Sequence, residues 1–97
     1  MTEQPDPVIH PSVRLKVMSA LKPLPQGGAL EFLRLRSLTG ATDGNLGAHL
    51  TTLEQAGYIA IHKAFEGKKT RTSVSMTPKG RRAFENYLAF LREILDG

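Results

Sequence analysis

The hydrophobic positions of this chain follow a helical period in its first part. From Pro11, which suits a first helical position, apolar residues recur at i, i+4, i+7 and i+8 and mark one face of a helix: Val13, Val17, Ala20 and Leu21. Prolines 23 and 25 and the glycine pair 27–28 then end this helix in a loop. Before the helix, Pro5 and Pro7 predict an extended arm over residues 1–10.

Two more helices follow the loop. A short helix fits residues 31–38, with Gly40 placed to cap its C-terminal end and with one apolar face: Phe32, Leu35 and Leu38. Thr42 or Asp43 can cap a third helix that runs to about Ala56 and is closed by the glycine that follows. The third helix has an apolar seam at i, i+4 and i+7: Leu46, Leu50 and Leu53.

After the third helix the period of the pattern falls to two. Ile59 and Ile61 share one face of a strand, and residues 71–76 alternate again. Residues 66–69, which include a glycine and two lysines, read as the turn between these strands. The pattern therefore predicts a β-hairpin with a basic tip.

The amino-acid composition excludes several classes of protein. The 97 residues suit one domain, and the absence of cysteine excludes disulfide scaffolds and thiolate metal sites. No run is long and apolar enough for a membrane span, and the N-terminus lacks the pattern of a signal peptide, so we expect a soluble, cytoplasmic protein. The net charge of +4 is uneven, because residues 63–82 carry seven bases against Glu66 alone. Such a segment is typical of a polyanion-binding surface, although a solvated loop would have the same charge.

The order of elements predicts a mainly α fold with a small β-hairpin. Helices two and three are joined by the few residues around Gly40, the connection of a helix-turn-helix, and the hairpin supplies a wing. Residues 50–59 read Leu-Thr-Thr-Leu-Glu-Gln-Ala-Gly-Tyr-Ile, and residues 77–80 read Thr-Pro-Lys-Gly. Together with the Thr-Asp-Gly-Asn-Leu of residues 42–46, these motifs resemble winged helix-turn-helix regulators of the MarR and ArsR groups. The resemblance covers about residues 11–95.

That resemblance implies a regulator whose third helix enters the major groove of double-stranded DNA while the wing contacts the backbone or minor groove. The residues of the third helix that would face DNA are small or polar: Thr42, Asp43, Gly44, Asn45, Ala48, His49, Thr51 and Thr52. Asn45 suits an adenine, and either Thr51 or Thr52 suits a phosphate or a thymine methyl. The expected wing contacts are Lys68, Lys69, Thr70 and Arg71.

The third helix departs from the family pattern because no lysine or arginine occurs between Ser37 and His62. Phosphate contacts must then come from the wing and from flanking bases: Arg34, Arg36 and Arg81. We therefore expect readout of DNA backbone and shape to outweigh direct base readout. The alternative is a winged-helix module that binds proteins and has lost sequence-specific DNA binding.

Enzymatic and metal functions find little support. The chain has no glycine-rich phosphate loop and no recognisable catalytic set, so we expect no catalysis and no cofactor. Three histidines without cysteine or closely spaced carboxylates do not predict a metal site.

The last helix, which begins at Thr77-Pro78, carries an apolar set too wide for one face of a small domain. We expect three segments: the arm over residues 1–10, a DNA-binding core over 11–77, and a C-terminal helix over 78–97 that forms a homodimer. The expected dimer contacts are Tyr87, Leu88, Phe90, Leu91, Ile94 and Leu95. The alternative is that this helix covers its own core. Whether a small-molecule effector binds is not encoded in any motif.

Overall fold

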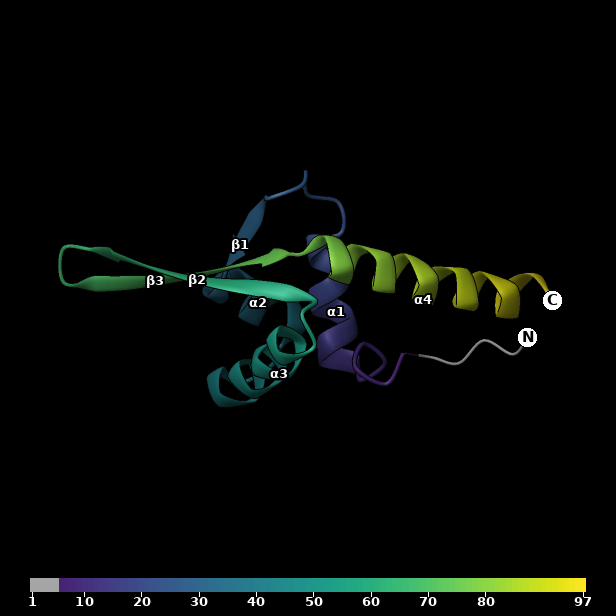
Figure 1. The fold of residues 1–97 in the computed structure, drawn as a ribbon. Coiled ribbons are helices and arrows are strands. Elements are labelled where there is room, and N and C mark those ends of the chain that lie inside the picture. The colour runs from purple at the N-terminus through teal and green to yellow at the C-terminus, as the bar shows by residue number, and fades with distance from the viewer. Residues whose placement is uncertain (1–5) are drawn as a thin grey trace.

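A computed structural model describes residues 6–97 and contains four helices and three strands (Figure 1). In chain order these are α1 (Ser12–Leu21), β1 (Ala29–Glu31), α2 (Phe32–Thr39), α3 (Asp43–Gln55), β2 (Ile59–Glu66), β3 (Lys69–Met76) and α4 (Pro78–Asp96). The three-helix core, the hairpin and the long last helix confirm the predicted winged-helix architecture.

The sheet has three antiparallel strands in the order β1-β3-β2. The strands β2 and β3, with the two-residue turn at 67–68, form the wing. The wing is longer than predicted, because pairing runs from Ile59 opposite Met76 to Glu66 opposite Lys69. Gly67 adopts a φ of +61° in the turn, which residues with side chains rarely do.

The strand β1 was not predicted. Residues 29–31 are too few to show an alternating pattern, and the prediction gave them to a loop and to the start of a helix. Leu30 pairs with Val74 of β3, so this strand exists because a longer strand is available beside it.

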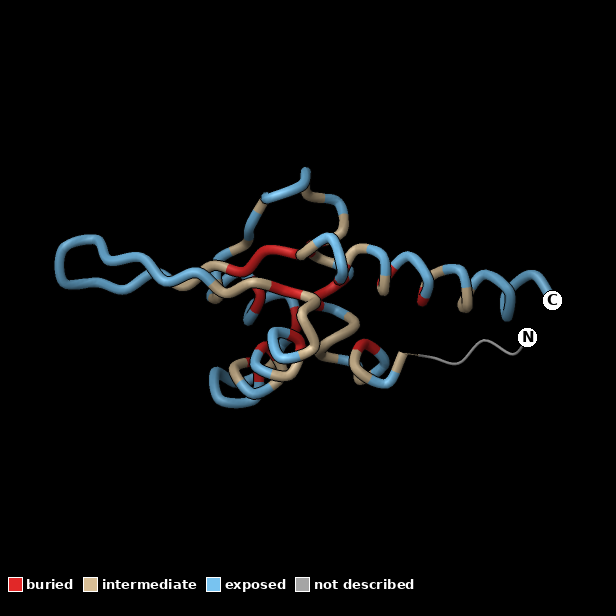
Figure 2. The backbone as a smooth tube through the Cα atoms, viewed as in Figure 1, coloured by how far each residue is buried: buried red, intermediate tan, exposed pale blue. Residues whose placement is uncertain are grey.

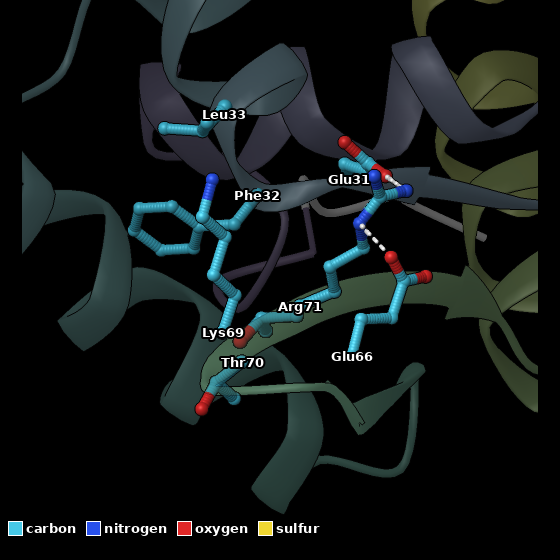
Figure 3. Close-up of a pocket in the computed structure, with 8 residues that line it drawn as sticks. Glu31, Phe32, Leu33, Glu66, Lys69, Thr70 and Arg71 are labelled. Atoms are coloured by element: carbon cyan, nitrogen blue, oxygen red, sulfur yellow. Dashed lines mark hydrogen bonds and ion pairs between the residues drawn. The ribbon is translucent and has the colours of Figure 1, made fainter.

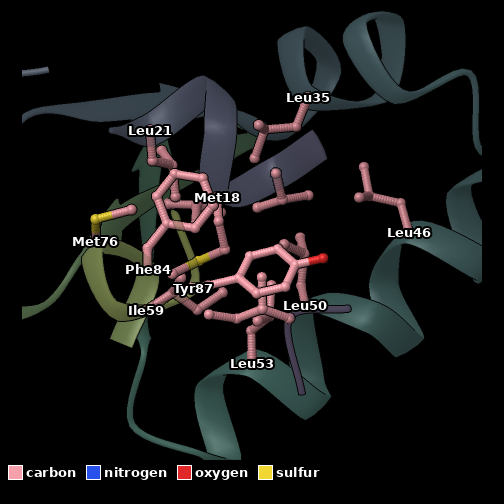
Figure 4. Packing of buried hydrophobic residues seen from close by; sticks show 13 residues of the cluster. Met18, Leu21, Leu35, Leu46, Leu50, Leu53, Ile59, Met76, Phe84 and Tyr87 are labelled. Atoms are coloured by element: carbon pink, nitrogen blue, oxygen red, sulfur yellow. The ribbon is translucent and has the colours of Figure 1, made fainter. Parts of the chain in front are cut away.

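The hydrophobic core lies between the helices and the base of the sheet (Figure 4). The predicted seam of α3 is confirmed, with Leu46, Leu50 and Leu53 all buried. On α1, Met18 is fully buried beside Val17, so the apolar surface of α1 is wider than one helical stripe. The core fixes how α3 is rotated about its axis and therefore which face of α3 is exposed.

Helix ends follow their predicted caps with one exception. Gly40 ends α2 with a φ of +71°, and the Thr42 side chain accepts a hydrogen bond from the Asn45 amide at 3.2 Å. Thr77 caps α4 in the same way, with Pro78 at the first helical position. Pro11, by contrast, precedes α1 as its N-cap and is not its first helical residue.

The described part of the predicted arm is a turn and not an extended segment. The amides of Ile9 and His10 donate to the Asp6 carbonyl oxygen, and the Ile9 side chain is completely buried. The hydroxyl of Tyr58 donates to Asp6 at 2.8 Å. Apolar burial of Ile9 thus overrides the extended preference of the prolines. Residues 1–5 of the arm lie outside the described residues.

The helix α4 leaves the body at the end opposite the wing (Figure 1). Only its first turns are buried, through Gly80, Phe84 and Tyr87, and the rest is increasingly exposed (Figure 2). Near its end, Ile94 and Leu95 have 61% and 83% of their surface exposed.

Candidate nucleic-acid interface

The predicted reading face of α3 is a small, polar surface on the outside of the molecule. Six of the eight predicted residues on α3 and its cap are exposed, five of them in its N-terminal half: Thr42, Asp43, Gly44, Asn45 and Ala48. The sixth is Thr51, whereas His49 and Thr52 are half-buried. This face lies opposite the buried leucine seam, so packing inside the chain leaves it free.

The two threonines on this face use their hydroxyl hydrogens within the helix. Thr51 Oγ1 donates to the Gly47 carbonyl at 3.0 Å, and Thr52 Oγ1 donates to the Ala48 carbonyl at 3.2 Å. A phosphate oxygen needs a donor, and these donors are already engaged. Of the two contacts predicted for these residues, the thymine methyl therefore fits this geometry better than the phosphate.

The helix α3 contains two glycines at positions where the structure has room for a side chain. A Cβ atom at Gly44 or Gly47 would meet nothing within 4 Å, and neither residue has a positive φ. A glycine in a helix interior costs about 1 kcal/mol relative to alanine. Nothing in the described chain explains these glycines.

Arg34, which stays a predicted phosphate contact, differs from the two other flanking arginines in its surroundings. It is exposed and forms no ion pair within residues 6–97. Arg36 instead binds Asp43 at 2.7 Å, where both side chains are exposed. Asp43 is the first residue of α3 and not its cap, and its charge suits the helix N-terminus.

Arg81, the third predicted phosphate contact, makes hydrogen bonds inside its own chain. Its guanidinium donates to the carbonyl oxygens of Lys22 and Leu24, each at 3.2 Å. It is half-buried and joins the end of α1 to the start of α4. Sequence spacing could not reveal this contact, since the partners are more than 50 residues away in the chain.

At the wing, Lys68, Lys69 and Thr70 are exposed, but Arg71 is held by two carboxylates. Its guanidinium lies 3.0 Å from Glu31 on β1 and 3.3 Å from Glu66 on β2 (Figure 3). Exposed ion pairs of this kind contribute little stability. They link Arg71 on the wing to Glu31 on β1.

A pocket of about 560 Å³ lies at this joint between the wing and the start of α2 (Figure 3). Phe32 and Leu33 form its apolar side, and Lys69 and Arg71 lie on the wing side. The ion pairs of Arg71 lie along the same pocket.

The sequence prediction missed Phe65, which lies on the wing with 78% of its surface exposed. The expected strand followed the alternation only as far as residue 62. Continuing the same period of two through residue 65 would have placed this aromatic residue next to the basic tip.

The dimer residues predicted on α4 divide into two groups. Tyr87 is only 3% exposed, and its hydroxyl lies 3.0 Å from Nδ1 of His10, so it belongs to the core of its own chain and not to a dimer surface. Beyond it the predicted residues are half-buried or exposed: Leu88, Phe90, Leu91, Ile94 and Leu95.

The histidines and acids of the described residues do not form a metal-binding cluster. Across residues 6–97, no three of them are arranged to hold a metal ion. His62 Nε2 lies 3.0 Å from the Ser75 hydroxyl on the neighbouring strand. In the same part of the chain, none of the helices has the length and apolar character needed to cross a membrane.

Comparison with known proteins gives consistent matches over most of the chain. A family model described as "Winged helix DNA-binding domain" matches residues 13–95. An uncharacterized protein of Methanocaldococcus jannaschii is 35% identical over 81 residues, which cover 84% of this chain and 85% of that protein. A transcriptional regulator homologue from Pyrococcus horikoshii OT3 has a TM-score of 0.82 at 28% identity, with 93% of this chain and 86% of that chain covered. A MarR-family regulator structure from Enterococcus faecalis V583 shares the fold, with a TM-score of 0.72 at 22% identity over 88% of this chain and 74% of that one.

Proposed function

This chain belongs to the family of winged helix DNA-binding domains, and on that premise we propose that it is a homodimeric transcriptional regulator. In this proposal α3 enters the major groove and the wing contacts the neighbouring backbone or minor groove. The two copies read a pseudo-palindromic site with half-sites about 10 base pairs apart. The family match also confirms the resemblance indicated by the three sequence motifs.

The observation that carries the proposal is the exposed glycine-containing face of α3. The absence of side chains at Gly44 and Gly47 lets the helix backbone approach another surface closely. Asn45 stands exposed on the same face, and its amide can pair with an adenine. A surface that only faced water would gain stability from alanine at both glycines.

The positive charge needed for phosphate binding comes from outside α3. Lys68 and Lys69 on the wing and Arg34 on α2 form no ion pair within residues 6–97. We therefore propose these three residues as phosphate contacts. With so few cations near the helix, DNA shape and backbone position contribute strongly to recognition.

The dimer part of the proposal rests on the outer half of α4. Leu88, Leu91 and Leu95 recur at helical spacing, and exposure rises along them toward the C-terminus. An apolar stripe that leaves its own core is suited to a second copy related by two-fold symmetry. Light scattering at micromolar concentration should return twice the single-chain mass of 10.6 kDa, and the single-chain mass would refute the dimer.

Fluorescence anisotropy tests the proposal directly. The duplex immediately upstream of the gene for this chain is compared with a scrambled duplex across a salt series. We expect tighter binding to the native duplex and a linear fall of log affinity with log salt, by about 0.9 per phosphate contact. Substituting both wing lysines, Lys68→Ala with Lys69→Ala, should lower that slope by up to about 2.

A second function, as a protein-binding module, is favoured by one observation. The charge of Arg36 beside α3 is neutralised by Asp43, so the helix presents almost no free cation to DNA. If the chain is a protein-binding module, neither duplex binds even at low salt, and the lysine substitutions leave the biological partner bound.

A further inference from the structure

Phe65 is the only exposed aromatic side chain within residues 6–97. The other five aromatic residues are buried or half-buried: Phe32, Tyr58, Phe84, Tyr87 and Phe90. One exposed apolar residue needs no explanation by itself. Two further observations bear on its function: its position on the wing and the charged residues near it.

The register of the wing places Phe65 on a defined face. Phe65 pairs with Thr70, and Lys63 pairs with Thr72, so these side chains share one face of the hairpin. Lys63 and Phe65 are two residues apart on one strand, a separation of about 7 Å. The same face, followed back toward the body, leads to Ile61 and the core.

The outer part of the wing is positively charged: Lys63 shares the face of the ring and Lys68 lies in the turn beyond it, whereas Lys69 pairs with Glu66 on the opposite face. Lys63, Lys68 and Lys69 are exposed and form no ion pair in the described part of the chain. The single acid there, Glu66, is already paired with Arg71. The wing extends away from the helices (Figures 1 and 2), so the ring can reach a surface that the body does not touch.

We propose that Phe65 is an apolar minor-groove contact, an inference that rests on the proposed DNA-binding function. The ring inserts partly at one base step, while Lys63 and Lys68 bind the flanking phosphates. A minor groove about 6 Å wide is too narrow for a helix but admits a single inserted side chain. Apolar wedges are a known means by which proteins open a base step from this side.

The cationic surroundings select DNA over an apolar protein surface. Three exposed lysines on the outer wing, of which Lys63 shares the face of the ring, repel most cationic partners and attract a polyanion. The ring itself is neutral, so its contact releases no counterion. Removing the ring should therefore leave the slope of log affinity against log salt unchanged, whereas removing a lysine should lower it.

The first test compares Phe65→Ala with Lys68→Ala by anisotropy on a duplex that the wild-type chain binds. We expect Phe65→Ala to weaken binding by about 5- to 150-fold, the range for losing an aromatic stacked on a base. Its salt slope should match that of the wild type. Lys68→Ala should lower the slope by about 0.9. Since residue 65 is exposed, the melting temperature of Phe65→Ala should stay within about 3 °C of the wild type.

The second test uses the absence of tryptophan from this chain. Phe65→Trp introduces a single indole at the proposed contact, and its fluorescence should fall on addition of the duplex, with the midpoint seen by anisotropy. The matched control is Ala89→Trp, at an exposed position on α4 at the other end of the molecule. The fluorescence of the control should not change with DNA.

The outcomes separate this inference from the proposed function. Unchanged affinity in Phe65→Ala, or unchanged fluorescence in Phe65→Trp while anisotropy reports binding, overturns the wedge and leaves the DNA-binding function intact. Failure of the wild-type chain to bind any duplex overturns both. A loss of affinity that comes with a lower salt slope would show that the substitution disturbed the lysines, which also refutes a separate role for the ring.

Discussion

The joint between the wing and α4 depends on one glycine. Gly80 lies in the first turn of α4, and its amide donates to the Thr77 cap at 3.0 Å. A Cβ atom there would collide with the carbonyl oxygen of Tyr58 and would lie 2.8 and 2.9 Å from two more backbone atoms of that residue. The same carbonyl accepts the Thr77 amide at 3.1 Å, so it cannot turn away without losing that bond.

The expected effect of Gly80→Ala is the difference of two opposing terms. Alanine gains about 1 kcal/mol over glycine in a helix. Overpacking costs about 1 to 3 kcal/mol and sometimes more, and a clash with backbone belongs at the upper end. The net loss should be at least about 2 kcal/mol. For a domain of this size that lowers the melting temperature by at least about 10 °C.

The matched control is Gly47→Ala, where a Cβ atom meets nothing within 4 Å. Only the helix-propensity term remains there, so the melting temperature should rise by up to about 5 °C. Circular dichroism melts at equal protein concentration measure both variants, because the stability of a dimer depends on concentration. A Gly80→Ala variant as stable as the wild type would refute the reasoning.

Three more predictions concern single side chains. Asp43→Asn should release Arg36, strengthen DNA binding and raise the salt slope by up to about 0.9, as measured by anisotropy. Burial and the hydrogen bond to Asp6 raise the pKa of Tyr58 to about 12. The protonated Tyr58 hydroxyl therefore stabilises the fold fully below pH 10, and this stabilisation is lost as the pH rises toward 12. In urea unfolding over this range, the free energy of unfolding should fall less with pH for Tyr58→Phe than for the wild type. Leu95→Asp should halve the mass seen by light scattering, whereas Ala89→Asp on the exposed polar face should not.

The sequence predicted those features of the fold that depend only on residues close together in the chain. The leucine seam of α3, the Gly40 cap and the Thr77-Pro78 start each depend on residues within one or two turns. The strand β1 and the docked turn at Ile9 depend instead on partners far along the chain. A pattern within one sequence window does not contain those partners.

The candidate site, like the fold, could be predicted only in part from the sequence. The exposed face of α3 followed from the position of its buried seam. Which arginines remain free did not follow, because Arg36, Arg71 and Arg81 each find an internal partner that only the folded chain brings near. Charge read from the sequence therefore counts cations that the structure has already paired.

The most direct test of the central claim is a methylation-protection footprint of the chain on a duplex selected from a random library. Dimethyl sulfate modifies guanine N7 in the major groove and adenine N3 in the minor groove, so one experiment reports on both. The proposed dimer predicts two clusters of guanine protection about 10 base pairs apart, each with protected adenines in a neighbouring minor groove. A selection that enriches no site, or a bound duplex whose guanines all remain reactive, would contradict reading of DNA by α3.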